Sequence, residues 1–490
     1  MSNEAGITRG QFFRRSAATG LVAAGTFGPR WVESALAAEP AETPKVYDFV
    51  SRPDLRPPML KVTTRREGRN AGHLFMAPNS GPGQRGSLII DDAGHPIWFR
   101  NSKPVVAMNF RPAIYKGKPV LSWWEGKTTH GLGNGTHIIM DDTYREIARV
   151  PAGNGRPSDL HEFIITDRGT ALTTAWERVS MDLSSRGGAS NGVVVGGIVQ
   201  ELELPSGRVL FEWHSLDHVS LDESHAGVST HAAYDYFHVN SVEFDHDGNL
   251  IVSARNTWGI YKIDRGSGEV MWRLGGKQSD FTMGPDTVFA WQHDARRHGG
   301  SEYLISVFDD GAAPQVQPYS KALILNLDMK RMHASVHRKY IHSPHLLAHA
   351  LGSVQVFPDS NVLVGWGTTP YVTEYTPDGH VVFDAHLPYG GENYRTLRVP
   401  WVGRPTQPPT AVYRHAAGSR SVYVSWNGAT EVKTWRLDTG AKPGALSDGP
   451  KAPRVSFETE LPVPSGAKYA TAVALDADGK ELGRSQVIRV

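Results

Sequence analysis

The chain has 490 residues, of which 40% are hydrophobic and 21% are charged, and its formal net charge is +1. This ordinary globular composition gives no reason to expect nucleic acid or an anionic membrane surface as a partner. The absence of cysteine excludes disulfides, thiolate nucleophiles and cysteine-based metal sites. With 51 glycines, 32 prolines and 13 tryptophans, the composition favours turn-rich β structure.

The N-terminal segment predicts an export signal. Arg9, Arg14 and Arg15 precede a weakly apolar run at residues 17–27, and Ala35-Leu36-Ala37 offers a cleavage site. The surroundings of Arg9 resemble a twin-arginine (Tat) signal with a glycine at the second arginine position. A short membrane anchor is the alternative, but the run is too short to span a bilayer. We therefore expect residues 1–37 to be a Tat-like signal peptide and the mature protein to be periplasmic or extracellular, without a transmembrane segment.

After a proline-rich extended lead-in, expected at residues 38–69, a repeated pattern begins. It is clearest between Tyr236 and Gly276, where an alternating run, Val239–Phe244, is followed by runs at 250–253 and 259–263 and by a fourth that closes on Trp272. Four short strands joined by Gly/Asp turns are typical of one blade of a β-propeller. A histidine that opens the innermost strand of such a blade, as His238 does, would point into the central channel.

Comparable units recur along the chain, each opening near a histidine: His161, His238, His293 and His349. Segments 180–197 and 216–234 resemble insertions, and about six blades fit the remaining length. Beyond residue 404 the pattern changes to short strands typical of a small antiparallel sandwich. We therefore predict an all-β protein, with a six-bladed β-propeller at 70–404 and an Ig-like β-sandwich at 405–490.

Several segments, in the same order, resemble the arylsulfotransferase (ASST) family between about residues 51 and 405. They are Asp159–Phe163, Tyr236–Val242, Trp272–Lys277, Gln292–Arg296, Gly352–Gln355, Asn361–Gly367 and Trp401–Gly403. The resemblance implies a secreted or periplasmic six-bladed propeller that needs no cofactor. It also implies transfer of a sulfuryl group from a phenolic sulfate donor to a phenol acceptor, without PAPS, through a histidine intermediate.

The resemblance also implies a set of catalytic residues. His238 and His293 match family motifs and would serve as oxyanion donors and acid/base groups. Lys321 falls where the family has an arginine, and it would act as a charge clamp without the planar fork of that side chain. His349 is the expected carrier of the sulfuryl group, with His345 and His342 as alternatives.

The remaining side chains leave several readings open. The tryptophans that could stack on a flat aryl substrate are Trp258, Trp291 and Trp366. Packing within blades is their alternative role. His161 is expected to fix a strand through Asp159 and Glu162, although it could also line the channel.

Two further functional readings stay open. We expect no metal, yet three neutral imidazoles with nearby carboxylates would also suit one. The alternative to a transferase is a non-catalytic secreted propeller that binds a glycan, a protein or an aromatic ligand.

Overall fold

The computed structural model describes residues 46–300, 302–416 and 418–490, so the predicted signal peptide at 1–37 lies outside the described residues. Within these ranges, no helix is both long enough and apolar enough to cross a membrane. Nearly all of the regular structure is antiparallel sheet, in agreement with the predicted all-β class.

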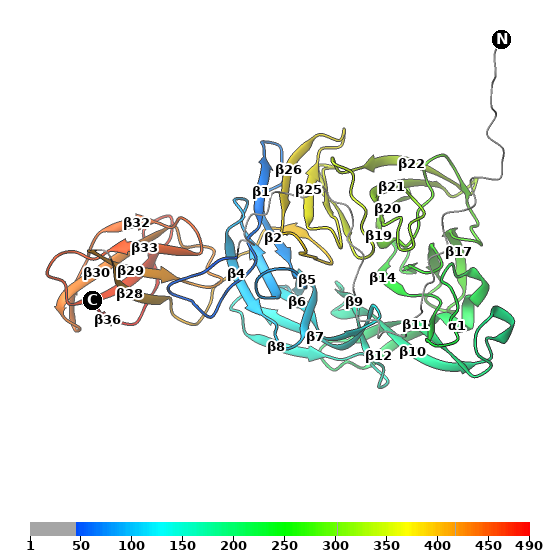
Figure 1. The fold of residues 1–490 in the computed structure, drawn as a ribbon, viewed down its shortest axis with the longest axis horizontal. Coiled ribbons are helices and arrows are strands. Elements are labelled where there is room, and N and C mark those ends of the chain that lie inside the picture. The colour runs from blue at the N-terminus through cyan, green and yellow to red at the C-terminus, as the bar shows by residue number, and fades with distance from the viewer. Residues whose placement is uncertain (1–45, 301, 417) are drawn as a thin grey trace, which may run out of the picture. The chain divides into compact units, whose positions relative to one another are not determined.

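The predicted six-bladed propeller is confirmed (Figure 1). Blade 1 consists of β27 (Leu397–Val399), β2 (His73–Met76), β3 (Gly86–Ile90) and β4 (Pro96–Asn101). Blade 2 consists of β5 (Val106–Tyr115), β6 (Lys118–Thr129), β7 (Leu132–Asp141) and β8 (Glu146–Val150). Blade 3 consists of β9 (Ser158–Ile165), β10 (Thr170–Met181), β11 (Gly192–Glu203) and β12 (Val209–His214). Blade 4 consists of β14 (Val239–Phe244), β15 (Leu250–Ala254), β16 (Gly259–Ile263) and β17 (Val270–Gly275). Blade 5 consists of β19 (His293–His298), β20 (Leu304–Asp309), β21 (Lys321–Asp328) and β22 (His333–Tyr340). Blade 6 consists of β23 (Ser353–Val356), β24 (Val362–Gly365), β25 (Tyr371–Tyr375) and β26 (Val381–His386).

Two distant pairings close the ring. The late strand β27 hydrogen-bonds to β2, with Leu74 opposite Arg398, and so supplies the inner strand of blade 1. At the outer edge of blade 6, β1 (Lys61–Arg65), which lies within the expected lead-in, pairs with β26. Figure 1 shows the yellow β26 beside the blue β1. A closed ring leaves only short sheet edges, which removes templates for unwanted strand pairing.

Blades 2 and 3 have the longest strands and are linked by one pairing, Gly135 opposite Ser158. The first expected insertion, at 180–197, is largely the end of the β10–β11 hairpin, whose strands stay paired from Thr170–Glu203 to Met181–Gly192. The hairpin tip carries η1 (Ser184–Arg186). The second expected insertion holds α1 (Ser215–His218), η2 (Leu221–Glu223) and β13 (Tyr234–Asp235), and β13 adds in parallel to β11.

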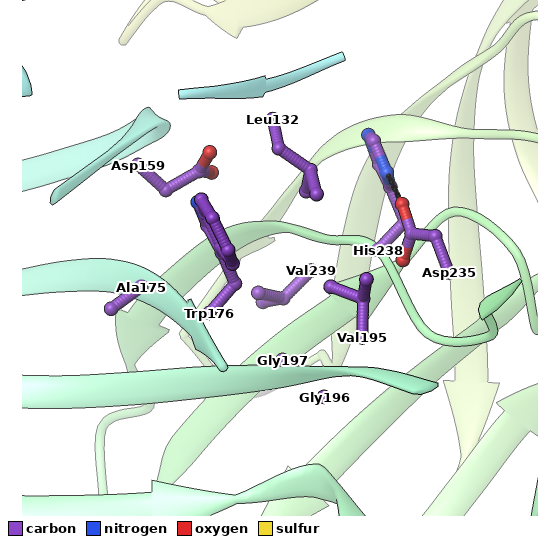
Figure 2. Close-up of a pocket in the computed structure, with 10 residues that line it drawn as sticks. All are labelled: Leu132, Asp159, Ala175, Trp176, Val195, Gly196, Gly197, Asp235, His238 and Val239. Carbon is purple, nitrogen blue, oxygen red and sulfur yellow. Dashed lines mark hydrogen bonds and ion pairs between the residues drawn. The ribbon is translucent and has the colours of Figure 1, made fainter. Parts of the chain in front are cut away.

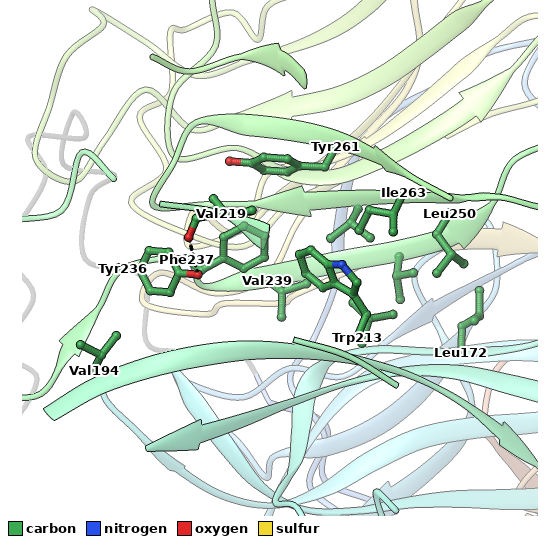
Figure 3. Packing of buried hydrophobic residues seen from close by; sticks show 14 of the residues in the cluster. Leu172, Val194, Trp213, Val219, Tyr236, Phe237, Val239, Leu250, Tyr261 and Ile263 are labelled. Atoms are coloured by element: carbon green, nitrogen blue, oxygen red, sulfur yellow. Dashed lines mark hydrogen bonds between the residues drawn. The ribbon is translucent and has the colours of Figure 1, made fainter. Parts of the chain in front are cut away.

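Apolar side chains fill the spaces between neighbouring blades. Between blades 3 and 4, Trp213 and Phe237 lie with their ring centroids 5.8 Å apart, and Phe237 lies 5.4 Å from Tyr261 (Figure 3). The indole N–H of Trp213 donates to the carbonyl of Gly268 at 2.9 Å, so the buried polar atom has a partner. This packing fixes the segment that carries His238.

The chain ends in the predicted small β-sandwich. One sheet contains β28 (Thr410–Ala416), β29 (Ser419–Ser425) and β33 (Glu458–Pro462). The other contains β30 (Thr434–Lys442), β31 (Ala445–Ser447), β32 (Lys451–Pro453), β34 (Tyr469–Leu475), β35 (Glu481–Arg484) and β36 (Ile488–Arg489). A separate core that includes Val422, Trp435 and Leu437 lies between them.

An additional short strand of the propeller, β18 (Thr282–Met283), pairs with β22.

A buried histidine between blades 2 and 3 makes the stability of the fold sensitive to acid. His137 stacks on Phe163 with ring centroids 4.3 Å apart, and its Nε2 lies 2.9 Å from Oγ1 of Thr173. Burial lowers the pKa of His137 from 6.5 to about 3. As the pH falls through 6.5, the unfolded chain therefore gains a proton that the folded protein does not bind, and unfolding becomes more favourable down to about pH 3.

We expect His137→Gln to reduce this acid sensitivity. Between pH 7 and pH 5, the free energy of unfolding of the wild type should fall by about 2 kcal/mol more than that of the variant. Guanidinium denaturation at the two pH values measures the difference. Equal losses in both proteins would show that His137 is not held neutral by burial.

Candidate active site

Three histidines from different blades meet where the inner strands begin. His161 lies in β9, His238 immediately precedes β14, and His293 is the first residue of β19. The ring centroid of His161 is 4.9 Å from that of His238 and 6.2 Å from that of His293. The ring of Tyr394 lies 5.6 Å from His161 and 6.0 Å from His293. The structure thus brings His238 and His293 together, as expected, and adds His161 between them.

Each of the three imidazoles has a carboxylate beside Nδ1. In His161 the partner is Asp159, at 2.5 Å, and in His238 it is Asp235, also at 2.5 Å. In His293 it is Asp310, at 2.8 Å. A carboxylate at Nδ1 favours the tautomer that carries its proton there, which leaves a lone pair on Nε2.

The surroundings of the three rings nevertheless differ. Burial lowers the pKa of His293 well below 6.5, and Arg255 lowers it further. Burial raises the pKa of its partner Asp310. The backbone N–H of Leu351 donates to Nε2 of His293 at 3.4 Å, so both ring nitrogens of this residue are engaged. Burial also lowers the pKa of His161, with Asp159 opposing the shift, and both rings are therefore neutral at pH 7.

His238 is the histidine of this group that lines a pocket (Figure 2). Its side chain keeps 9% of its surface exposed, and its backbone has a φ of 54°, which is uncommon outside glycine. Figure 2 shows His238 and Asp235 on one side of the pocket and Trp176 on another. The other lining residues are Leu132, Asp159, Ala175, Val195, Gly196, Gly197 and Val239.

Arg255 provides positive charge next to two of the histidine–carboxylate pairs. Its backbone N–H donates to the carbonyl of His238 at 3.0 Å. Its guanidinium donates to the carbonyl of His349 at 3.1 Å and lies 4.8 Å from the ring centroid of Trp291. Burial lowers the pKa of Arg255, while the charges of Asp310 and Asp235 raise it. The guanidinium therefore acts electrostatically on Asp310 and Asp235, the carboxylate partners of His293 and His238.

Next to the histidines, the axis is filled by a buried ionic cluster. Arg395 donates to Asp294 at 2.9 Å and to Glu162 at 3.0 Å and 3.2 Å. Arg296 also pairs with both carboxylates, and Arg111 lies 3.4 Å from Glu162. Burial raises the pKa of Glu162, but Arg296, Arg395 and Arg111 together bring it below its ordinary value. We call Arg111, Glu162, Asp294, Arg296 and Arg395 the axial ionic cluster.

The expected carrier, His349, and the expected clamp, Lys321, make contacts with groups other than the three rings. His349 has a half-buried side chain whose buried Nε2 has no hydrogen-bond partner within the described chain. Burial and Arg255 lower its pKa, and its link to the site runs through its carbonyl and Arg255. Lys321 opens β21 and pairs with Asp309 at 3.1 Å and with Gln317 at 2.6 Å. Its charge is already matched by a buried carboxylate.

The two alternatives to His349 make other contacts. His342 is buried, with Nδ1 2.8 Å from the carbonyl of Pro344 and Nε2 3.3 Å from Asp384. The ring of His345 lies against Tyr319, with centroids 4.4 Å apart.

The three expected stacking tryptophans have their contacts inside the protein. Trp258 stacks on His225 with ring centroids 3.6 Å apart, and it meets Trp291 edge-on at 5.1 Å. Trp291 also lies against Arg255. Trp366 is buried, and its indole N–H donates to Thr373 at 3.1 Å. Trp176, which the sequence did not single out, is the tryptophan found in the pocket.

Sequence reasoning did not select three residues that the structure places at this site. Asp235 and Trp176 belong to the second-insertion strand β13 and to β10, neither of which carries a family motif. Arg255 follows β15, outside the quoted motifs. His161 does pair with Asp159 as expected, and its ring also lies at the centre of the histidine group. Within the described residues, no group of three or more His, Asp or Glu side chains has an arrangement suited to a metal ion.

Comparison with known sequences assigns the family. The sequence model of the arylsulfotransferase (ASST) family matches residues 111–387, more than half of the chain. The protein therefore belongs to the arylsulfotransferase (ASST) family, and membership supports an aryl sulfotransferase activity in general terms. No curated protein matches the chain.

Solved structures resemble the chain only remotely. A Bacteroides caccae protein of unknown function is 11% identical with a TM-score of 0.42, covering 66% of this chain and 98% of its own. The GH43 protein BlXynB of Bacillus licheniformis is 10% identical with a TM-score of 0.30, covering 79% and 90%. Virginiamycin B lyase of Staphylococcus aureus is 8% identical with a TM-score of 0.24, covering 66% and 83%.

The axial ionic cluster gives a stability prediction. Replacing Arg395 by methionine would leave Glu162 and Asp294 short of a buried partner, so we expect the free energy of unfolding to fall by about 3–5 kcal/mol. Arg404→Met is the control, because this guanidinium is 58% exposed in its pair with Glu431 and its loss should cost no more than about 1 kcal/mol. Chemical denaturation measures both, and equal effects would contradict a special role for the cluster.

Proposed function

We propose that the protein is a PAPS-independent aryl sulfotransferase that moves a sulfuryl group from a phenolic sulfate ester to a phenol through a histidine intermediate. The observation that carries this proposal is His238, which lines the pocket while Asp235 holds its Nδ1 and the imidazole of His161, itself beside His293, lies next to it. The family assignment supports the reaction class. No cofactor is needed, because the nucleophile, the proton carrier and the positive charge are all side chains of this chain.

The first half-reaction transfers the sulfuryl group to the protein. Nε2 of His238 attacks the sulfur of the ester, the bond from sulfur to the aryl oxygen breaks, and the electron pair leaves with the phenolate. Loose sulfuryl transfer depends mainly on positioning and charge stabilisation, as phosphoryl transfer does. The ring becomes positively charged as it takes up the group, and the carboxylate of Asp235 at Nδ1 stabilises that charge.

His161 suits the role of proton carrier. Its ring lies 4.9 Å from that of His238, and Asp159 holds its Nδ1. Because the ring of His161 is neutral at pH 7, the donor phenolate leaves as an anion and is protonated by solvent. In the second half-reaction, Nε2 of His161 takes a proton from the acceptor phenol as the phenol oxygen attacks sulfur and the bond between sulfur and Nε2 of His238 breaks, which restores His238. His161 then releases that proton to solvent.

We assign Arg255 as the residue whose guanidinium stabilises the charge on the sulfuryl oxygens. A guanidinium presents donors in a planar fork that suits two oxyanion atoms, whereas an ammonium does not. Arg255 is bonded through its backbone to His238, while Lys321 is already paired with Asp309. His293, with both nitrogens engaged, would position the site rather than donate a proton.

His349 stays the second candidate for the carrier. It has a free Nε2 and a lowered pKa, both of which suit a nucleophile. The geometry supports His238 better, because its Nδ1 has a carboxylate partner and its ring borders the pocket.

We also propose export through the Tat-like signal at 1–37, and domains at 70–404 and 405–490.

The reaction is tested with p-nitrophenyl sulfate as donor and a phenol as acceptor. We expect His238→Ala to lower turnover by at least about 1,000-fold, because the nucleophile is lost. A sulfo-histidine should appear at residue 238 of the wild type when donor is supplied alone, as detected by peptide mass spectrometry at alkaline pH. His231→Ala, at an exposed loop histidine, should behave as the wild type.

A second variant separates the carrier from its orienting group. Asp235→Asn should lower turnover about 100-fold or more while leaving the fold intact, because an amide does not stabilise the charged ring. An adduct on His349 instead of His238 would reassign the carrier. No turnover and no adduct in the wild type would leave the non-catalytic propeller as the better description.

A further inference from the structure

The tip of the β6–β7 hairpin of blade 2 reaches the ring of His238 in blade 4. The two-residue turn His130-Gly131 joins the strands, with φ values of 51° and 82°. Positive φ at both central residues defines a type I′ turn, which favours glycine at the second position. A Cβ added to Gly131 would lie 3.1 Å from Cε1 of His238 and 3.8 Å from Nε2.

The stem of the hairpin is bonded to two residues that line the same pocket. The backbone N–H of Gly133 donates to Oδ1 of Asp159 at 2.7 Å. The indole N–H of Trp176 donates to the carbonyl of Gly133 at 2.7 Å. The neighbouring Leu132 lines the pocket with Asp159 and Trp176. These bonds fix the place from which the turn approaches His238.

We propose that Gly131 is a specificity-determining residue: its missing side chain leaves the space beside Nε2 of His238 that the transferred group and the adjoining part of the substrate occupy. An atom 3.8 Å from Nε2 is already in van der Waals contact with it. A side chain at 131 and a group bonded to Nε2 therefore compete for the same volume. The inference rests on the proposed function for the identity of that group, and it does not depend on which aryl ester is the natural donor.

The chain provides a matched control for this residue. At the other end of β6, the turn Lys116-Gly117 has φ values of 50° and 74°, so it has the same backbone geometry. A Cβ at Gly117 would meet nothing within 4 Å. Gly131→Ala and Gly117→Ala thus impose a similar backbone strain, and they differ in contact with His238.

Two readouts test the proposal on these variants. The first is the rate at which diethyl pyrocarbonate acylates His238, followed by peptide mass spectrometry, which reports access to the ring whether or not the protein transfers sulfuryl groups. The second is kcat/KM for p-nitrophenyl sulfate. We expect Gly131→Ala to lower both at least tenfold and Gly117→Ala to change neither by more than twofold.

The outcomes separate this proposal from the proposed function. Unchanged acylation of His238 in Gly131→Ala would overturn the role of Gly131. Slower acylation in that variant, with no sulfuryl transfer by the wild type, would support Gly131 as the residue that leaves the ring of His238 accessible and would overturn the transferase. If Gly131→Ala does not fold, Gly131→Asn with Gly117→Asn replaces the pair, because asparagine tolerates positive φ.

Discussion

The guanidinium of Arg395 is the point on which the geometry of the propeller axis depends. Its hydrogen bonds reach the inner strands of four blades, through Asn109 in β5, Glu162 in β9, Asn240 in β14 and Asp294 in β19. A buried arginine is stable only when its donors are satisfied and its charge is matched, and both conditions hold here. Because Arg395 lies two residues before the closing strand β27, ring closure and the ordering of the axis are secured by one segment.

The same interactions decide where the histidines lie. Successive residues of a strand point to opposite sides. The carboxylates of Glu162 and Asp294 therefore point toward Arg395 in the axial ionic cluster, while the adjacent His161 and His293 point toward the group of rings. Asp294 and the nearby His238 have positive φ, a conformation that costs about 1–3 kcal/mol for residues with a side chain. Surrounding hydrogen bonds and packing must offset that cost, and such strain is characteristic of functional sites.

Local pattern predicted the blades well, and it could not predict what joins them. The bounds of β14 and β16 agree with the alternating runs read from the sequence, because side-chain alternation and Gly/Asp turns are local signals. β27 has three residues and a partner far earlier in the chain, so neither alternation nor turn chemistry reveals it. The candidate site shows the same contrast between local signals and long-range packing. His238 and His293 could be recognised from sequence motifs at strand starts. Asp235 and Arg255 became neighbours of those rings only through long-range packing.

The three clustered imidazoles differ in their environments, and the roles proposed for them follow from those differences. All three have a carboxylate at Nδ1, so the contrast arises at Nε2 and in burial. For His293, the backbone N–H of Leu351 occupies Nε2, which removes the lone pair that a nucleophile needs. His161 is buried and neutral beside a second ring, a setting suited to receiving a proton briefly. His238 combines the tautomer that frees Nε2 with a place on the pocket wall. Attack on an incoming ester requires both properties, and their combination here argues for His238 over the other two rings as the carrier.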